Sequence, residues 1–173
     1  VLGYRFTRNG SYVLRLRDYE SAGGPDVHYR LNVGEFPVVT DIYPLGARAG
    51  ATAEVEIRGF NLGGAKTARV TVPVSALPGA TVPVSLDTPR GPLYLTRSLD
   101  VGSDAEVSDS RGNLSTMLAR QVSVPCAING RLETEQPHYY RIHAAKGQQL
   151  TIDVLARRSG SPLDTEMEVL DAT

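Results

Sequence analysis

The sequence predicts an all-β protein built from antiparallel β-sandwich modules. Three observations lead to this fold class. Apolar and polar residues alternate with a period of two in several short runs, turn-forming residues separate those runs, and a helical period is almost absent. Apolar residues make up 41% of the 173 residues, which is enough to bury a core.

The alternation is clearest in residues 11–17, where Tyr12, Leu14 and Leu16 share one face of an extended chain. Each such run predicts a strand with one buried face. The same pattern recurs in residues 27–33, 53–58, 140–143, 150–154 and 166–169.

Turn signals separate the runs. The Asn9-Gly10 pair suits a tight hairpin, and glycine-rich or proline-rich stretches occupy most of the other gaps. A helical pattern appears only in residues 114–120, where we expect a short helix.

Two prolines mark the middle of the chain. Val72-Pro73-Val74-Ser75 recurs ten residues later as Val82-Pro83-Val84-Ser85, on either side of a Pro78-Gly79 turn. Because proline has no backbone N–H for the ladder, both segments are expected at edge strands or strand ends, where proline also resists sheet-to-sheet aggregation.

Charge and cysteine content exclude some functions. The net charge of −1 comes from 18 basic and 19 acidic residues spread along the chain, so no nucleic-acid partner is expected. No apolar stretch is long enough to predict a membrane span. The single Cys126 excludes an intrachain disulfide and a cysteine-built metal site. The chain opens at Val1 almost directly in strand-like sequence, which predicts a processed product or a piece of a longer protein.

Composition divides the chain into residues 1–36, 37–118 and 119–173. The central part resembles an immunoglobulin-like IPT/TIG module, with a strand ending in proline, a glycine loop, an alternating strand and then Gly-x-Asn-x-Gly. The matching residues are Pro37 to Pro44, Gly46, Gly50-Ala51-Thr52 and Val55 to Gly63.

The last part resembles the start of a bacterial pre-peptidase C-terminal (PPC) domain. The matching residues are Pro125, Ile128-Asn129-Gly130-Arg131-Leu132, Tyr139-Tyr140-Arg141-Ile142 and Ala144 to Leu150, then Ser161 to Asp164 and Val169-Leu170-Asp171. The family usually has aspartates before the aromatic strand, whereas this chain has Gln136-Pro137-His138, which leaves the role of those aspartates open.

The first part resembles the closing strands of the same family, through Tyr4-Arg5-Phe6, Asn9 to Asp18 and Tyr29-Arg30-Leu31. Neither outer part is then complete by itself, and an incomplete sandwich exposes an apolar face and strand edges. Our hypothesis is that residues 1–35 and 119–173 pair, within one chain or between two, so that self-association is an expected partnership.

Catalytic groups are not indicated by the sequence. His138 and His143 fall on opposite faces of a strand, so they are not expected to share a metal ion, and His28 and His143 are expected to be ordinary strand residues. Cys126 is expected to be a small buried hydrophobe. The Gly-x-Ser-x-Gly frame of a serine nucleophile and a phosphate-binding glycine loop are both missing.

The strongest candidates for a metal site are Asp164, Glu166 and Glu168. Calcium prefers several carboxylate and carbonyl oxygens, and these residues lie close in sequence. A solvated strand face explains the same pattern, and it is the interpretation that we favour.

The candidates for ligand binding are Tyr19 and Tyr139. Most of the eight tyrosines fall on faces expected to be buried, but Tyr19 lies in a glycine-rich loop, and one of the Tyr139-Tyr140 pair must point outward. The lack of tryptophan does not favour a strong sugar-stacking surface.

Together these features predict a non-catalytic accessory segment of a larger bacterial protein, for spacing, folding support or adhesion beside neighbouring domains. The family resemblance implies a secreted, periplasmic or cell-surface location. One alternative is a module that binds polysaccharide or matrix protein, with or without calcium. Another is part of a hydrolase whose active site lies outside this chain.

Overall fold

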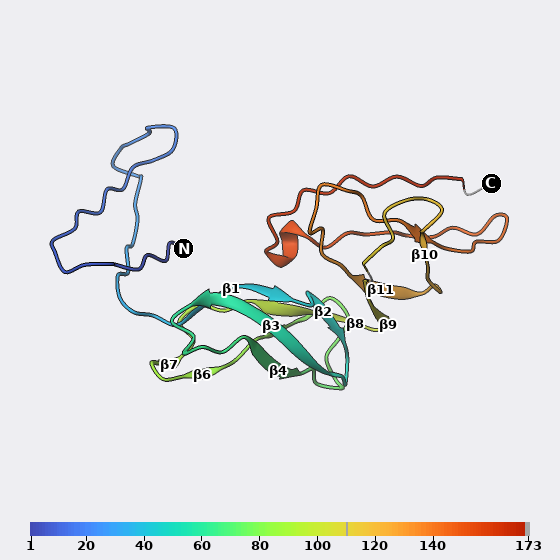
Figure 1. Cartoon of the computed structure of the whole chain (residues 1–173), viewed down its shortest axis with the longest axis horizontal. Coiled ribbons are helices and arrows are strands. Elements are labelled where there is room, and N and C mark those ends of the chain that lie inside the picture. Colours follow the sequence, from blue (N-terminus) through green and yellow to red (C-terminus); the bar gives the residue numbers. More distant parts are fainter. Residues whose placement is uncertain (110, 172–173) are drawn as a thin grey trace. The chain divides into compact units, whose positions relative to one another are not determined.

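The computed structural model describes residues 1–109 and 111–171 (Figure 1). The chain divides into two compact units, Val1–Glu35 and Phe36–Thr173. In the described residues, regular structure consists of strands and one short 3₁₀ helix, which confirms the all-β prediction. The elements are β1 (Val38–Tyr43), β2 (Gly46–Arg48), β3 (Thr52–Phe60), β4 (Thr67–Thr71), β5 (Thr81–Pro83), β6 (Asp87–Thr88), β7 (Gly91–Pro92), β8 (Ser98–Gly102), β9 (Ala105–Ser108), β10 (Arg120–Gln121), β11 (Cys126–Asn129), β12 (Tyr140–Arg141) and η1 (Arg157–Ser159).

Two sheets form a sandwich in the first part of the second unit. One has the order β1-β3-β4 and is antiparallel, with a register shift between Val39 and Asp41. The other has the order β2-β8-β5, in which β2 runs parallel and β5 antiparallel to β8. The parallel pair differs from the purely antiparallel sandwich that alternation predicts, because a period of two does not encode strand direction.

The core lies between these two sheets. Val39 and Val55 from the first sheet and Leu99 from the second are completely inaccessible to solvent. The other buried members of this cluster are Ile42, Ala47, Ile57, Leu62, Ala68, Val70, Val72, Val84 and Val101. Both sheets therefore bury their apolar faces against each other, as a sandwich requires.

Strand β3 confirms the alternation seen in residues 53–58. Val55 and Ile57 are buried. Glu54, which precedes Val55, and Glu56, which lies between the two, are exposed. The alternation follows from the pleat, which turns successive side chains to opposite faces.

The prolines occupy the expected edges. Strands β4 and β5 each end a sheet, with Pro73 shortly after β4 and Pro83 closing β5. Gly79 adopts a φ of 84° in the turn between them, where the Ala80 N–H donates to the Leu77 carbonyl at 3.0 Å. Proline at these positions costs no hydrogen bond inside a sheet.

Two further strand pairs, both parallel, form in the rest of the second unit. Strand β11 pairs with β9, and β12 pairs with β10. The short helix expected in residues 114–120 is wrong: Leu118 and Ala119 close turns onto Ser115 and Thr116, and β10 then begins at Arg120. The only helix in the described residues is η1. Residues 120–121 pair with β12 as a strand, and this pairing outweighs the weak local preference for a helix.

Several alternating runs do not become strands in the described structure. Residues 11–17, 27–33, 150–154 and 166–169 form no ladder, and β12 includes only Tyr140 and Arg141 of residues 140–143. A strand needs a neighbour to satisfy its backbone groups, so alternation alone does not produce one.

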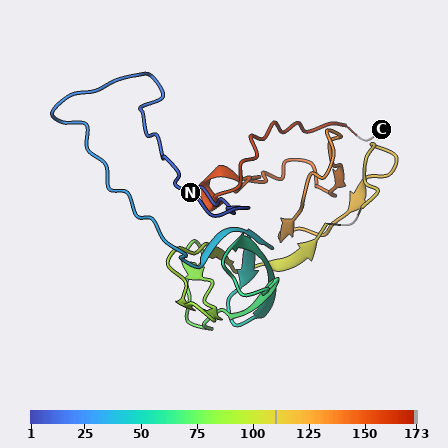
Figure 2. The same ribbon diagram turned by 60° about the vertical axis from the view of Figure 1, so that its left-hand side comes forward.

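The first unit shows this most plainly. Figure 2 draws residues 1–35 as a trace without arrows. At Asn9-Gly10 no ladder forms; instead the Tyr12 hydroxyl donates to the Arg8 carbonyl at 2.8 Å, and the Phe6 ring contacts the rings of Tyr4 and Tyr12.

In the part of the chain that the structure describes, no helix is long and apolar enough to cross a membrane.

Candidate functional site

A pocket of about 340 Å³ lies within the second unit, where the end of β1, the loop after β9 and the segment after β11 meet. Its lining mixes aromatic, charged and small residues. They are Tyr43, Asp109, Arg111, Gly112, Leu114, Arg131, Glu133, Thr134 and His138. Stretches far apart in the sequence build this pocket, so its existence depends on how β11 is held.

Asn129, the last residue of β11, holds these stretches together. Its side-chain oxygen accepts hydrogen bonds from the backbone N–H groups of Leu45 and Gly46 at 3.1 and 3.2 Å, and its Nδ2 donates to Glu106 Oε2 at 2.6 Å. Its backbone carbonyl accepts from the Tyr43 hydroxyl at 2.9 Å and from the Asp109 N–H at 2.7 Å. One residue thus ties β1, β2 and β9 to β11.

The acid that Asn129 contacts, Glu106, has a shifted pKa. Partial desolvation raises the pKa of the exposed Glu106 carboxyl above its ordinary value, the hydrogen bond from Asn129 lowers it, and the charge of Asp104 raises it further. Desolvation is the largest of these effects, and it acts upward because it disfavours the charged form.

The pocket wall contains a buried histidine–aspartate pair. His138 Nδ1 lies 2.6 Å from Asp109 Oδ2, and only 13% and 6% of the two side chains are exposed. Asp109 Oδ1 is buried and has no hydrogen-bond partner among the described residues. The pair fixes the orientation of the imidazole ring and connects the loop after β9 to the segment before β12.

Tyr140 lies next to this pair. Burial, a hydrogen bond to the Asp109 carboxylate and the charge of that carboxylate raise the pKa of Tyr140 to about 12, against smaller lowering effects of Asn113 and Arg120. Asn113 is itself buried, and its Nδ2 donates to the Tyr139 carbonyl at 3.1 Å. A connected polar cluster therefore lies behind the pocket wall.

This shift predicts a loss of stability at alkaline pH. The folded protein keeps the Tyr140 proton up to a pH of about 12, whereas an unfolded tyrosine loses it near its ordinary pKa of 10.0, so the free energy of unfolding should fall as the pH rises between these values. Urea unfolding at several pH values measures this slope. The Tyr140→Phe variant should show a shallower slope, and an unchanged slope would contradict the assignment.

The pocket rim consists of exposed ion pairs and one stacked arginine. The Arg131 guanidinium lies 3.9 Å from the centroid of the Tyr43 ring and bonds to Glu56 at 2.7 Å. Arg111 pairs with Glu133 at 3.1 Å. The pKa of Tyr43 is raised by burial, while the positive charge of Arg131 acts in the opposite direction. Exposed pairs of this kind contribute little stability, so these arginines can exchange partners at low cost.

The His138–Asp109 contact gives a second prediction. Replacing His138 by alanine removes the imidazole partner of the buried Asp109 carboxylate, which should lower the free energy of unfolding by about 2 kcal/mol. Urea unfolding monitored by circular dichroism measures the change. His143→Ala is the matched control, because His143 is exposed and should tolerate the change. Equal effects of the two substitutions would show that the pair contributes nothing specific.

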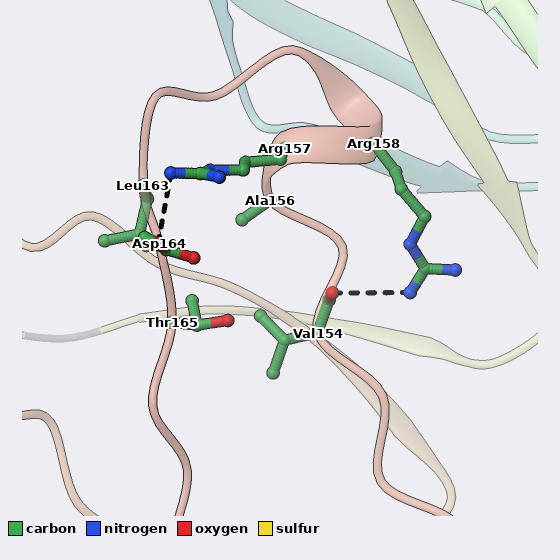
Figure 3. Close-up of a pocket in the computed structure, with 7 residues that line it drawn as sticks. All are labelled: Val154, Ala156, Arg157, Arg158, Leu163, Asp164 and Thr165. Carbon is green, nitrogen blue, oxygen red and sulfur yellow. Dashed lines mark hydrogen bonds and ion pairs between the residues drawn. The ribbon is translucent and has the colours of Figure 1, made fainter.

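A second, smaller pocket of about 120 Å³ lies beside η1, between the residues before it and the segment after it (Figure 3). Arg157 bonds to Asp164 at 3.1 Å, and Arg158 bonds to Asp153 at 2.6 Å and to the Val154 carbonyl at 3.4 Å. Ser159, at the end of η1, bonds to Asp100 of β8 and holds this loop against the sandwich.

The calcium candidates lie in and beside this smaller pocket. Asp164 lines it and pairs with Arg157, while Glu166 and Glu168 are exposed further along the chain. Among the described residues, no three His, Cys, Asp or Glu side chains are grouped so that they could hold a metal ion. Calcium binding by these three residues stays a prediction.

The two tyrosine candidates have different surroundings. Tyr19 is 96% exposed in the first unit, beside a turn in which the Asp18 carboxylate accepts the N–H groups of Glu20 and Ala22. Tyr139 is half-buried, and its backbone bonds to Arg120 and Asn113. Neither tyrosine lines one of the two pockets.

The sequence alone did not indicate the pair of His138 and Asp109. The sequence suggested only one possible role for His138, a metal ligand shared with His143. In the structure, the partner of His138 is Asp109, which is distant in the sequence. No local pattern in the sequence links these two residues.

Neither protein-family models, curated proteins nor solved structures match this chain.

Proposed function

We propose that this chain is a non-catalytic accessory segment of a larger secreted or cell-surface bacterial protein, in which it spaces, supports or attaches neighbouring domains. The supporting observation is the sandwich, whose interior is formed by apolar side chains from both sheets. Its edge strands β4 and β5 are followed or closed by proline, which discourages pairing with other sheets. A module with these properties suits a spacer.

The polar contacts of the second unit support the same proposal. Asn129, Glu106 and the His138–Asp109 pair connect strands to one another and so serve the fold. The extracytoplasmic setting rests on the resemblance to PPC and IPT/TIG modules.

Thermal unfolding of the purified chain, with and without calcium, polysaccharides and collagen, tests the proposal. A ligand present at a hundred times its dissociation constant adds about 2.7 kcal/mol to the stability of the folded state, a shift that is easily measured. The scaffold proposal expects no shift with any of them. A calcium-dependent shift that disappears in the Asp164→Asn/Glu166→Gln/Glu168→Gln variant would replace it with a calcium-binding function.

The second candidate function is a ligand-binding module, and the larger pocket is the observation that favours it. The pocket combines a tyrosine, two arginines with exposed partners and an oriented histidine. Such a mixture of one apolar surface and a few polar groups is typical of small-molecule sites.

A variant of the pocket rim separates the two functions. Arg111 is almost fully exposed, so Arg111→Gln should leave the fold intact while changing the pocket rim. Loss of a ligand-induced thermal shift in Arg111→Gln, but not in the Arg69→Gln control on β4, a residue that does not line the pocket, would support binding at this pocket. Equal shifts in both variants would place the ligand elsewhere.

A further inference from the structure

The residue that fastens β11 is followed directly by a glycine, Gly130. Asparagine followed by glycine is especially prone to deamidation, because glycine has no side chain to hinder attack of its backbone nitrogen on the asparagine amide. Asn129 also ties β11 to β1, β2 and β9 through its hydrogen bonds. A chemical change of this one side chain would therefore act on the fold of the second unit.

Deamidation needs no reagent other than water. The Gly130 nitrogen bonds to Cγ of Asn129, the Cγ–Nδ2 bond breaks, and Nδ2 leaves as ammonia with the proton that the Gly130 nitrogen gives up. Water then opens the resulting cyclic imide at either of its carbonyl groups. The product at position 129 is aspartate, or isoaspartate with a longer backbone.

The fold keeps the two reacting groups apart. Ring closure brings the Gly130 nitrogen to the side of Cα that carries Cβ, whereas the extended backbone of β11, which Asn129 ends, holds this nitrogen away from Cβ. The same planar peptide unit contains the Asn129 carbonyl, which accepts from the Tyr43 hydroxyl at 2.9 Å and from the Asp109 N–H at 2.7 Å. Three further hydrogen bonds fix the side chain. Ring closure therefore requires that β11 first detach.

The product does not fit the place that Asn129 occupies. The Asn129 Nδ2 donates to Glu106 Oε2 at 2.6 Å. After deamidation a carboxylate oxygen replaces this donor, so two carboxylates face each other, and the charge of Asp104 already acts on Glu106. Isoaspartate in addition lengthens the backbone between β11 and the residues that form one side of the larger pocket.

We propose that Asn129-Gly130 is a deamidation site that is protected while β11 is paired with β9, that it is modified when β11 detaches, and that the modification then hinders the return of β11. The described partners of Asn129 all lie within the second unit. Because the residues after Asn129 line the larger pocket, its deamidation would also remove one side of that pocket. The proposal does not depend on the scaffold function.

Deamidation rates test the protection. The purified chain is kept in mildly alkaline buffer with and without denaturing urea, and peptide mapping by mass spectrometry follows the modified fraction at residue 129. Without urea the rate should be lower by about tenfold or more, because only the locally opened chain reacts. In urea the rate should be close to that of Asn9, which is also followed by glycine. Equal rates at residue 129 with and without urea, or a slow reaction in both, would overturn the proposal.

A single hydroxyl group tests the role of the fixed carbonyl. Tyr43→Phe removes the donor to the Asn129 carbonyl, so it should raise the rate without urea severalfold. Tyr94→Phe is the matched control, because it removes the same atom from a half-exposed ring that stacks on Phe36, and its rate should equal that of the wild type. Equal rates in the two variants would contradict protection through this carbonyl.

The effect of the product is tested with Asn129→Asp. This variant should unfold at a lower urea concentration than the wild type, and adding Glu106→Gln should recover part of the loss, because the glutamine amide can donate to the new carboxylate. Glu106→Gln alone should give no such gain. If Asn129→Asp does not fold, recovery of the fold in the double variant gives the same information. A variant Asn129→Asp as stable as the wild type, or one that Glu106→Gln does not stabilise, would overturn the proposed hindrance.

Discussion

Replacing Gly59 by alanine is expected to lower the free energy of unfolding by about 3 kcal/mol, because the added methyl group collides with the neighbouring strand. A Cβ atom at Gly59 would lie 1.9 Å from the Val38 carbonyl oxygen and 3.0 Å from the Val39 Cα. Both are backbone atoms of β1, so β1 and β3 must separate where the register shifts. Glycine is required here for close approach of two backbones.

Urea unfolding followed by far-ultraviolet circular dichroism measures this effect, since the chain has no tryptophan to report by fluorescence. Gly24→Ala is the matched control, because a Cβ atom there has no neighbouring atom within 4 Å. If both variants unfold at the same urea concentration as the wild type, the two strands approach each other less closely than described.

Replacing Leu99 by alanine is expected to cost about 3 kcal/mol through lost burial and the cavity left behind. Leu99 is completely buried on β8, the middle strand of its sheet, and belongs to the core cluster of both sheets. The loss would therefore weaken the contact between the two layers of the sandwich.

The same urea titration measures the Leu99→Ala effect. Leu77→Ala deletes the same atoms from a side chain that is 74% exposed, and it should change stability by less than about 0.5 kcal/mol. Similar losses at both positions would mean that Leu99 does not lie at the centre of the core.

The contacts around Asn129 explain why the larger pocket depends on the sandwich. Its side chain bonds to Leu45 and Gly46 at the start of β2 and to Glu106 on β9. The residues that follow it, from Arg131 to His138, form one side of the pocket. Damage to the sandwich should therefore also disturb the pocket, whereas the exposed rim can vary without cost to the fold.

The sequence by itself determined the fold class, the alternation within β3 and the edge positions of Pro73 and Pro83. Each depends on a local property. A pleated strand turns successive side chains to opposite faces, and proline lacks an N–H wherever it occurs. These properties act between neighbours in the chain, so they can be predicted without knowing the tertiary structure.

Only the tertiary structure decided which alternating runs become strands and which polar residues meet. Residues 53–58 have partners in β1 and β4 and form a strand, whereas residues 11–17 have an equally clear pattern and no ladder. The pair of His138 and Asp109 forms because β11 packs parallel to β9, and Asn129 bonds to Leu45 across 84 positions of sequence. Backbone and side-chain hydrogen bonds of this kind need partners that only the folded chain brings close.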